Sequence, residues 1–252
     1  MTDRTRGALF PAELPRFTRV TPDAEVADLV EWYWVPEWDL PTGHTSAQRV
    51  LAYPATNLVV EPGGVALHGA TTRVTERVLS GTGWAVGAVL RPAAAAVLSG
   101  TLAELVDAST AVDASGLAAA VAAVMPGNAR RAAGLVGTWL DQRIGVRTPR
   151  SRLANDMARL LMTDAEVLRV EDAASRLCVS VRTLQRLAHR TVGLPPAAMI
   201  RRRRLQEAAQ RVREHPEEPL ADIAAALGYS DQAHLAGDFR AVLGFTASSY
   251  RG

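Results

Sequence analysis

PLADIAAALGYSDQAHLAGDFRAVLGFTASSY, residues 219–250, repeats the pattern of VEDAASRLCVSVRTLQRLAHRTVGLPP, residues 170–196. In each copy a leucine precedes a glycine by nine residues (Leu184 and Gly193, Leu235 and Gly244). By these markers the copies lie 51 residues apart. An internal repeat indicates two copies of one structural unit, so it decides the fold of the second half.

Each copy predicts a helix, a tight turn and a second helix. Ser180 is a good N-cap for the second helix of the first copy, because its hydroxyl can accept from a free backbone N–H. Ser230 or Asp231 takes that place in the second copy. Gly193 and Gly244 suit the left-handed residue that ends many helices. Such a helix-turn-helix presents the exposed face of its second helix to a DNA major groove.

The exposed faces of the two second helices predict the DNA contacts. An arginine can donate two hydrogen bonds to guanine and a glutamine can pair with adenine, each worth ~1–3 kcal/mol of discrimination. The residues expected to read bases are Arg182, Gln185, Arg186, Gln232, Ala233 and Ala236. Those expected to contact the DNA backbone are Ser180, Arg190, Arg203, Ser230, His234 and Arg240.

The stretch MIRRRRLQEAAQRV, residues 199–212, joins the two copies and predicts a connecting helix of about 17 residues, ~25 Å long. Its apolar face consists of Leu205, Ala208, Ala209 and Val212. On a helical wheel Arg203 points away from that face, so we expect it to reach a phosphate. The other arginines are expected to reach phosphates or to pair with acids such as Glu207. A nuclear-localisation or membrane role for the arginine run is disfavoured, because the run sits inside a periodic helix.

The first half of the chain predicts strands. Short stretches rich in β-branched and aromatic residues are separated by Gly and Pro, which is typical of a barrel or sandwich. Helical spacing of Ala and Leu follows at 101–144, and GVRTPRS, residues 145–151, is the expected linker. The sequence thus predicts an α+β chain: a β-rich effector-binding or dimerisation domain at 1–145 with trailing helices, and an all-α domain at 152–252.

Charge and composition narrow the classes of protein. Residues 1–127 carry 8 arginines against 13 acidic residues, a net −5, and residues 128–252 carry 20 against 13, a net +7. This asymmetry suggests an anionic partner such as nucleic acid for the second half. No apolar run approaches the ~18 residues of a membrane span, and the N-terminus does not look like a signal peptide. We therefore expect a soluble cytoplasmic protein without a membrane partner.

Cysteine and histidine usage argues against a metal site. The single cysteine, Cys178, cannot form an internal disulfide or a cysteine-based zinc site, and we expect it to be a small buried residue. His44, Glu61 and His68 are a conceivable metal cluster, but a metal-binding barrel of the cupin kind usually offers three histidines and a carboxylate. No metal or cofactor is predicted.

Tryptophans are concentrated in the strand region. Trp32, Trp34 and Trp38 are separated by even numbers and share a face in an unbroken strand. With Trp84 they define a candidate effector pocket. The alternative is that these rings fill the core of the domain.

The double motif resembles the AraC/XylS family of bacterial transcription regulators. IAAALGYSDQAHLAGDFRAVLGFTASSYR, residues 223–251, carries the resemblance, which covers about 152–252. It implies that Arg182 and Arg186 and, in the second copy, Gln232, Ala233, Ala236 and Gly237 fall at base-reading positions. The family more often has polar or basic residues where this chain has Ala236 and Gly237, so we expect the first motif to dominate sequence readout.

The first half resembles a β-rich sensor domain attached to some members of that family, through YWVPEWDLP, PATNLVVEPGG and GWAVGAVLRP. The resemblance implies a cupin-like barrel that binds an effector or supports dimerisation. The helix expected at 128–144 offers a dimer surface of Leu135, Trp139 and Leu140.

These patterns predict a sequence-specific DNA-binding transcriptional regulator rather than an enzyme. Expected partners are double-stranded DNA, a small-molecule effector, RNA polymerase and a second copy of the chain. One alternative is a helical protein-interaction module with degenerate DNA binding. Another is an enzyme fused to a DNA-binding domain. Against the enzyme, GxSxG, HExxH and Walker motifs are absent, and Cys178 lies outside the half where some relatives carry a nucleophilic cysteine.

Overall fold

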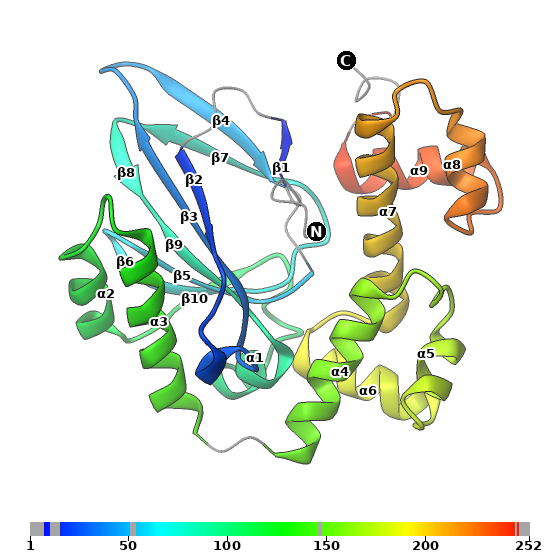
Figure 1. The fold of residues 1–252 in the computed structure, drawn as a ribbon, viewed down its shortest axis with the longest axis horizontal. Coiled ribbons are helices and arrows are strands. Elements are labelled where there is room, and N and C mark those ends of the chain that lie inside the picture. The colour runs from blue at the N-terminus through cyan, green and yellow to red at the C-terminus, as the bar shows by residue number, and fades with distance from the viewer. Residues whose placement is uncertain (1–7, 11–15, 51–53, 146–147, 245, 247–252) are drawn as a thin grey trace.

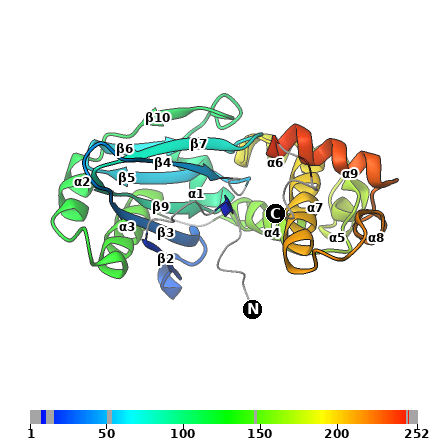
Figure 2. The same cartoon turned by 90° about the horizontal axis from the view of Figure 1, so that it is seen from above.

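The protein consists of a β-rich part and a helical part that lie side by side (Figures 1 and 2). The structure, a computed structural model, describes residues 8–10, 16–50, 54–145, 148–244 and 246. Residues 8–111 form the strands and one helix, and helices follow from residue 115 onward. The α+β architecture predicted from the sequence is confirmed.

Two antiparallel sheets form the first part. The larger sheet has the strand order β10-β6-β5-β9-β3-β2, with β8 also paired to β3, and the smaller has the order β1-β4-β7. The strands are β1 (Ala8–Phe10), β2 (Arg16–Val20), β3 (Val30–Asp39), β4 (Thr45–Val50), β5 (Asn57–Glu61), β6 (Gly64–His68), β7 (Thr75–Ser80), β8 (Thr82–Trp84), β9 (Val86–Leu90) and β10 (Ser109–Ala111). Figures 1 and 2 show β4 and β7 lying over one face of the larger sheet.

Helices cover the other face of the larger sheet, and the main core lies between them and the strands. They are α1 (Pro92–Leu98), α2 (Ser115–Ala122) and α3 (Ala129–Ile144), with a short 3-10 turn, η1 (Ala24–Val26). Tyr33 and Val35 of β3 pack in one cluster with Val136 and Leu140 of α3. Alternation along β3 sends these side chains to the helical side and its tryptophans to the other.

The position of α3 changes the expected dimer surface. Leu140 is fully buried in the core, and Leu135 and Trp139 pack against that core as partly buried side chains. The prediction that these three residues form a surface for a second copy is therefore wrong for Leu140. The apolar face of α3 is needed within the same chain, because it covers the larger sheet.

The second part contains α4 (Pro149–Thr163), α5 (Val170–Arg176), α6 (Val181–Thr191), α7 (Pro196–Glu214), α8 (Leu220–Ala226), α9 (Gln232–Asp238) and a π-helical turn, η2 (Phe239–Leu243). One apolar cluster joins α4, α5, α6 and the start of α7. Another joins the rest of α7 to α8, α9 and η2. The connecting helix α7 has 19 residues and belongs to both clusters. Helix α4 begins within the stretch expected as a linker, of which residues 146–147 lie outside the described residues.

The two parts are docked through polar contacts as well as apolar ones. Asn155 of α4 donates to the carbonyl of Asp28 at 2.7 Å and accepts from the N–H of Ala93 at 2.9 Å. Near the other end of α7, the N–H of Val74 donates to the carbonyl of Val242 at 3.0 Å. These hydrogen bonds hold the helical part to the β-rich part. Within the described residues, no helix is both long and apolar enough to cross a membrane.

Candidate nucleic-acid interface

Helix α6 is built as the second helix of a helix-turn-helix. The Ser180 hydroxyl accepts from the N–H of Thr183 at 3.1 Å, so it caps the helix as predicted. Leu184, Leu187 and Ala188 are buried on one side, against α4 and α5. Because this apolar face is fixed to the domain, the opposite face of α6 is presented to solvent.

The exposed face of α6 is a row of side chains that can donate hydrogen bonds. It consists of Arg182, Gln185, Arg186, His189 and Arg190. They recur at spacings of three and four, so they lie together on one side of the helix. None of the five side chains has a hydrogen bond or ion pair with another residue of the described part of the chain. Four of them are residues for which DNA contacts were predicted, and the structure brings these four together.

Helix α9 has a less polar exposed face. Asp231 is its cap, accepting from the N–H of His234 at 2.8 Å, and this hydrogen bond lowers the pKa of the Asp231 carboxyl. Ser230, the alternative cap, instead lies 3.1 Å from Nδ1 of His234. Gln232, Ala233 and Gly237 are exposed, Ala236 is half-buried, and Arg240 is exposed just beyond the helix.

The turns of the two motifs have the same backbone form. Cys178 and Gly228, 50 residues apart, both have positive φ, at 53° and 72°. In each turn the following N–H donates to a carbonyl five residues back, from Val179 to Ala174 and from Tyr229 to Ala224. Cys178 is exposed. The prediction that it is a buried residue is wrong, because it occupies the left-handed turn position that glycine fills in the other copy.

Arg203 does not point away from the core of the domain. It is fully buried, and its guanidinium donates to the carbonyls of Asp164 at 2.5 Å and Val167 at 2.7 Å. The prediction that Arg203 contacts a DNA phosphate is therefore wrong. A helical wheel of residues 199–212 shows no neighbour on the side of α7 that carries Arg203. In the structure the segment between α4 and α5 covers that side.

The other three arginines of the run each contact a different segment of the chain. Arg201 forms a 2.5 Å ion pair with Asp238 of α9, and Arg204 stacks over the ring of Tyr229 at 3.9 Å. Arg202 donates to the carbonyl of Thr71, in the β-rich part, at 2.7 Å, and desolvation lowers its pKa to about 10. Four consecutive arginines thus point in four directions and tie α7 to the second motif, to the segment before the first motif and to the first part of the chain.

Comparison with known sequences agrees with this geometry. Residues 173–252 match the family described as a helix-turn-helix domain, which here spans both motifs. The C-terminal domain is of the AraC type. A domain of this type supports the interpretation of the protein as a DNA-binding transcriptional regulator. Residues 18–111 match a second family, described as a domain of unknown function (DUF6597).

Solved structures with a similar course of the chain include two regulators. The C-terminal domain of AraT, a response regulator from Geobacillus stearothermophilus, is 23% identical, with a TM-score of 0.36, over 41% of this chain and 84% of its own. ToxT from Vibrio cholerae O395 is 11% identical, with a TM-score of 0.46, over 87% of this chain and 96% of its own.

The four tryptophans of the strand region do not line one pocket. Trp84 is buried in the core on the helical side of the larger sheet. On the opposite side, Trp34 donates from Nε1 to Asn57 at 3.0 Å and Trp38 to the carbonyl of Ser80 at 3.2 Å. Trp32 lies under the guanidinium of Arg19, 4.0 Å from its ring centre. The effector pocket predicted from these four residues is wrong, because β8 turns Trp84 to the other face.

The conceivable metal cluster is also not formed. Both carboxylate oxygens of Glu61 accept from Arg77, at 2.5 and 2.9 Å. His44 is exposed in the turn before β4. Among the described residues, no group of three or more His, Cys, Asp or Glu side chains is placed to hold a metal ion.

Proposed function

We propose that the protein is a sequence-specific DNA-binding transcriptional regulator without enzymatic activity, which acts on DNA in the cytoplasm. The observation that carries this proposal is the exposed face of α6. There Arg182, Gln185 and Arg186 are exposed within an AraC-type domain, with no partner in the described part of the chain. A helix of this shape enters the major groove, where arginine and glutamine recognise guanine and adenine.

The second motif acts in this proposal mainly by holding the DNA backbone. Ala236 and Gly237 offer no hydrogen-bonding side chain on α9. Ser230, His234 and Arg240 surround the start and end of the helix and serve as backbone contacts, as Ser180 and Arg190 do at α6. Gln232 and Ala233 contribute the remaining base contacts. Sequence preference therefore comes chiefly from α6.

The β-rich domain at 1–145 senses a small molecule or mediates dimerisation in this proposal. Its support is the docking of the two parts through Asn155 and Arg202, because a change in the first part would then reach α4 and α7. RNA polymerase and a second copy of the chain are the protein partners that a regulator of this kind would use.

The test is binding of the full chain to labelled duplexes measured by fluorescence anisotropy. One duplex carries the region upstream of the protein's own gene, and the control carries the same bases in shuffled order. We expect tighter binding to the upstream duplex and a loss of affinity with added salt, because phosphate contacts release counterions. Absence of binding to either duplex at low salt would overturn the proposal and favour the helical protein-interaction module.

A further inference from the structure

The two motifs are separate units that share one helix. One apolar cluster joins α4, α5, α6 and the start of α7, and another joins the rest of α7 to α8, α9 and η2. The motifs therefore pack at different ends of α7 (Figure 1). The separation and relative rotation of α6 and α9 then depend on the contacts that hold one motif against the other beside this helix.

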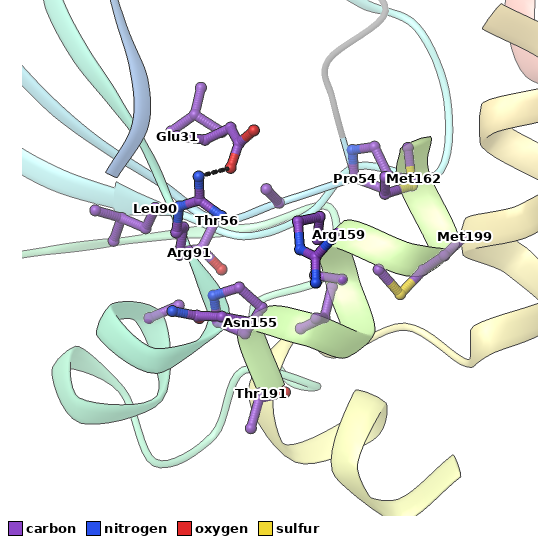
Figure 3. A pocket seen from close by; sticks show the side chains of 16 residues that line it. Glu31, Pro54, Thr56, Leu90, Arg91, Asn155, Arg159, Met162, Thr191 and Met199 are labelled. Carbon is purple, nitrogen blue, oxygen red and sulfur yellow. Dashed lines mark ion pairs between the residues drawn. The ribbon is translucent and has the colours of Figure 1, made fainter. Parts of the chain in front are cut away.

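The β-rich part contacts the two units at different places. Beside the first unit, a cavity of about 30 Å³ lies at the junction, with room for about two waters. Its lining includes Thr56 from the β-rich part, Met162 from α4 and Met199 from α7 (Figure 3). At the second unit, the N–H of Val74 donates to the carbonyl of Val242, in η2. This contact lies beyond α9, at the opposite end of that helix from its turn.

The segment between α4 and α5, residues 164–169, is fixed to the first motif. Arg176 of α5 pairs with Asp164 at 2.5 Å and with Glu166 at 2.9 Å. Val167 is fully buried in the apolar cluster of the first motif. These polar and apolar contacts give the segment a defined position relative to α5.

The same segment reaches the second motif through Leu168. Its side chain lies against Gly228, the turn glycine of that motif, because a Cβ placed on Gly228 would come within 2.9 Å of Cδ1 of Leu168. Carbon atoms in contact are normally ~3.5–4.0 Å apart, so a side chain at position 228 would collide with Leu168. Leu168 is 39% exposed, so it forms a contact between two units and is not enclosed in a core.

The connecting helix is the third point of attachment of the segment. From α7 the buried guanidinium of Arg203 donates to the carbonyls of Asp164 and Val167. The segment therefore contacts the first motif, the connecting helix and the turn of the second motif. Such a bridge opposes bending or twisting of α7 between the two motifs.

We propose that Leu168 is a positioning residue, which sets the rotation of α9 relative to α6 and thereby the spacing of the DNA sites that the protein accepts. Leu168 holds the turn before α9 and Val74 holds the end beyond it, so loss of one contact allows the motif to rotate about the other. One base pair changes the separation of two sites by ~3.4 Å and their rotation by ~35°. The effect on DNA rests on the proposed function, whereas the arrangement of the two helices does not.

Distances between spin labels on α6 and α9 test the arrangement in the full chain without DNA. Cys178 is the single cysteine, so Cys178→Gly allows labels to be placed by Arg190→Cys on α6 and Ala233→Cys on α9, both at exposed positions. We expect pulsed double electron–electron resonance to give one narrow distance distribution. Leu168→Ala should broaden it, and Leu168→Met, which conserves volume and apolar contact, should restore the narrow form.

Leu160→Ala on α4 is the matched control. Leu160 packs against the apolar cluster of the first motif as a partly buried side chain, so its truncation costs packing within one unit. It should leave the distance distribution as narrow as in the wild type. A broad distribution in the wild type, an unchanged one in Leu168→Ala, or an equal broadening by Leu160→Ala would overturn the role of Leu168.

Duplexes of altered length test the consequence for DNA. Hydroxyl-radical footprinting of the upstream duplex locates the two protected segments, and one base pair is then inserted or deleted midway between them. The wild type should bind the altered duplexes about tenfold more weakly than the original, as for one mismatched base pair, and Leu168→Ala should lose less than about threefold.

The outcomes separate the proposal from the proposed function. Equal affinities of the wild type for all three duplexes, or equal losses in the wild type and Leu168→Ala, would overturn the link to spacing. Failure of the wild type to bind the upstream duplex at all would count against the proposed function. The spin-label distances would still decide whether Leu168 positions α9.

Discussion

The guanidinium of Arg203 donates a 2.7 Å hydrogen bond to the backbone carbonyl of Val167, 36 residues earlier in the chain. A second bond reaches the carbonyl of Asp164, and Glu207 lies 3.6 Å away on the next turn of α7. The side chain is fully buried. Arg203 therefore fixes the connecting helix to the segment between α4 and α5, which leads into the first motif.

Arg203→Ala should lower the free energy of unfolding by about 3 kcal/mol, since the carbonyl of the buried Val167 and the partly buried carboxylate of Glu207 lose this partner. Urea unfolding followed by circular dichroism measures the change. Arg182→Ala, at an exposed arginine on α6, is the matched control and should stay within about 0.5 kcal/mol of wild type. Equal stability of the two variants would contradict the structural role of Arg203.

Arg182→Ala and Arg186→Ala should relax sequence preference without loss of stability. Each removes a side chain that can read a base, so the affinity gap between upstream and shuffled duplexes should shrink by about 1–3 kcal/mol. Anisotropy titrations at one fixed salt concentration measure the gap. Arg176→Ala on α5, where the arginine pairs with Asp164 and Glu166, is the control and should leave the gap as it is. If both α6 variants kept the wild-type difference in affinity between the two duplexes, α6 would not be the helix that reads the bases.

The helix-turn-helix pair could be predicted from the sequence because its signals are local. The cap at Ser180 and the buried leucines of α6 depend on residues within a few positions of one another, and the repeat is visible when the two stretches of sequence are compared. The fates of Arg202 and Arg203 could not be predicted in this way. A helical wheel gives the direction of a side chain, but the segments that receive these two, at Thr71 and Val167, are 131 and 36 residues away.

In the β-rich part, too, some features could be predicted from the local sequence and others depend on distant residues. Alternation correctly separates Trp34 from Tyr33 across the sheet, but only the pairing of β8 with β3 decides which face Trp84 takes. The cavity at the domain junction had no local signal either. Thr56 and Met199, which both line it, are far apart in sequence and meet only through the docking of the two parts.

Cys178→Gly should stabilise the protein. A side chain at φ 53° carries a steric cost of ~1–2 kcal/mol, which glycine avoids while losing ~0.5–1 kcal/mol through greater freedom of the unfolded chain. The expected net gain in the free energy of unfolding is about 0.5 kcal/mol. The second motif already has a glycine, Gly228, at the corresponding turn position. Chemical denaturation measures it. Ser175→Gly, on the exposed side of α5, is the control and should destabilise by about 0.5 kcal/mol. A Cys178→Gly chain less stable than wild type would show that the turn is not strained.

His68 should make the first part sensitive to acid. Burial is the main cause that lowers its pKa from the ordinary value of 6.5; Arg77 acts in the same direction and Glu61 against it. Between the lowered native pKa of His68 and about pH 6.5 the native state therefore holds fewer protons than the unfolded chain. This stability is fully present above about pH 6.5 and is lost as the pH falls from there through the native pKa. Melting temperatures between pH 7.5 and 5.5 measure the loss, and His68→Gln should flatten the slope. His44→Gln, at an exposed histidine, is the matched control and should keep the wild-type slope. An unchanged slope in His68→Gln would assign the acid sensitivity to other groups.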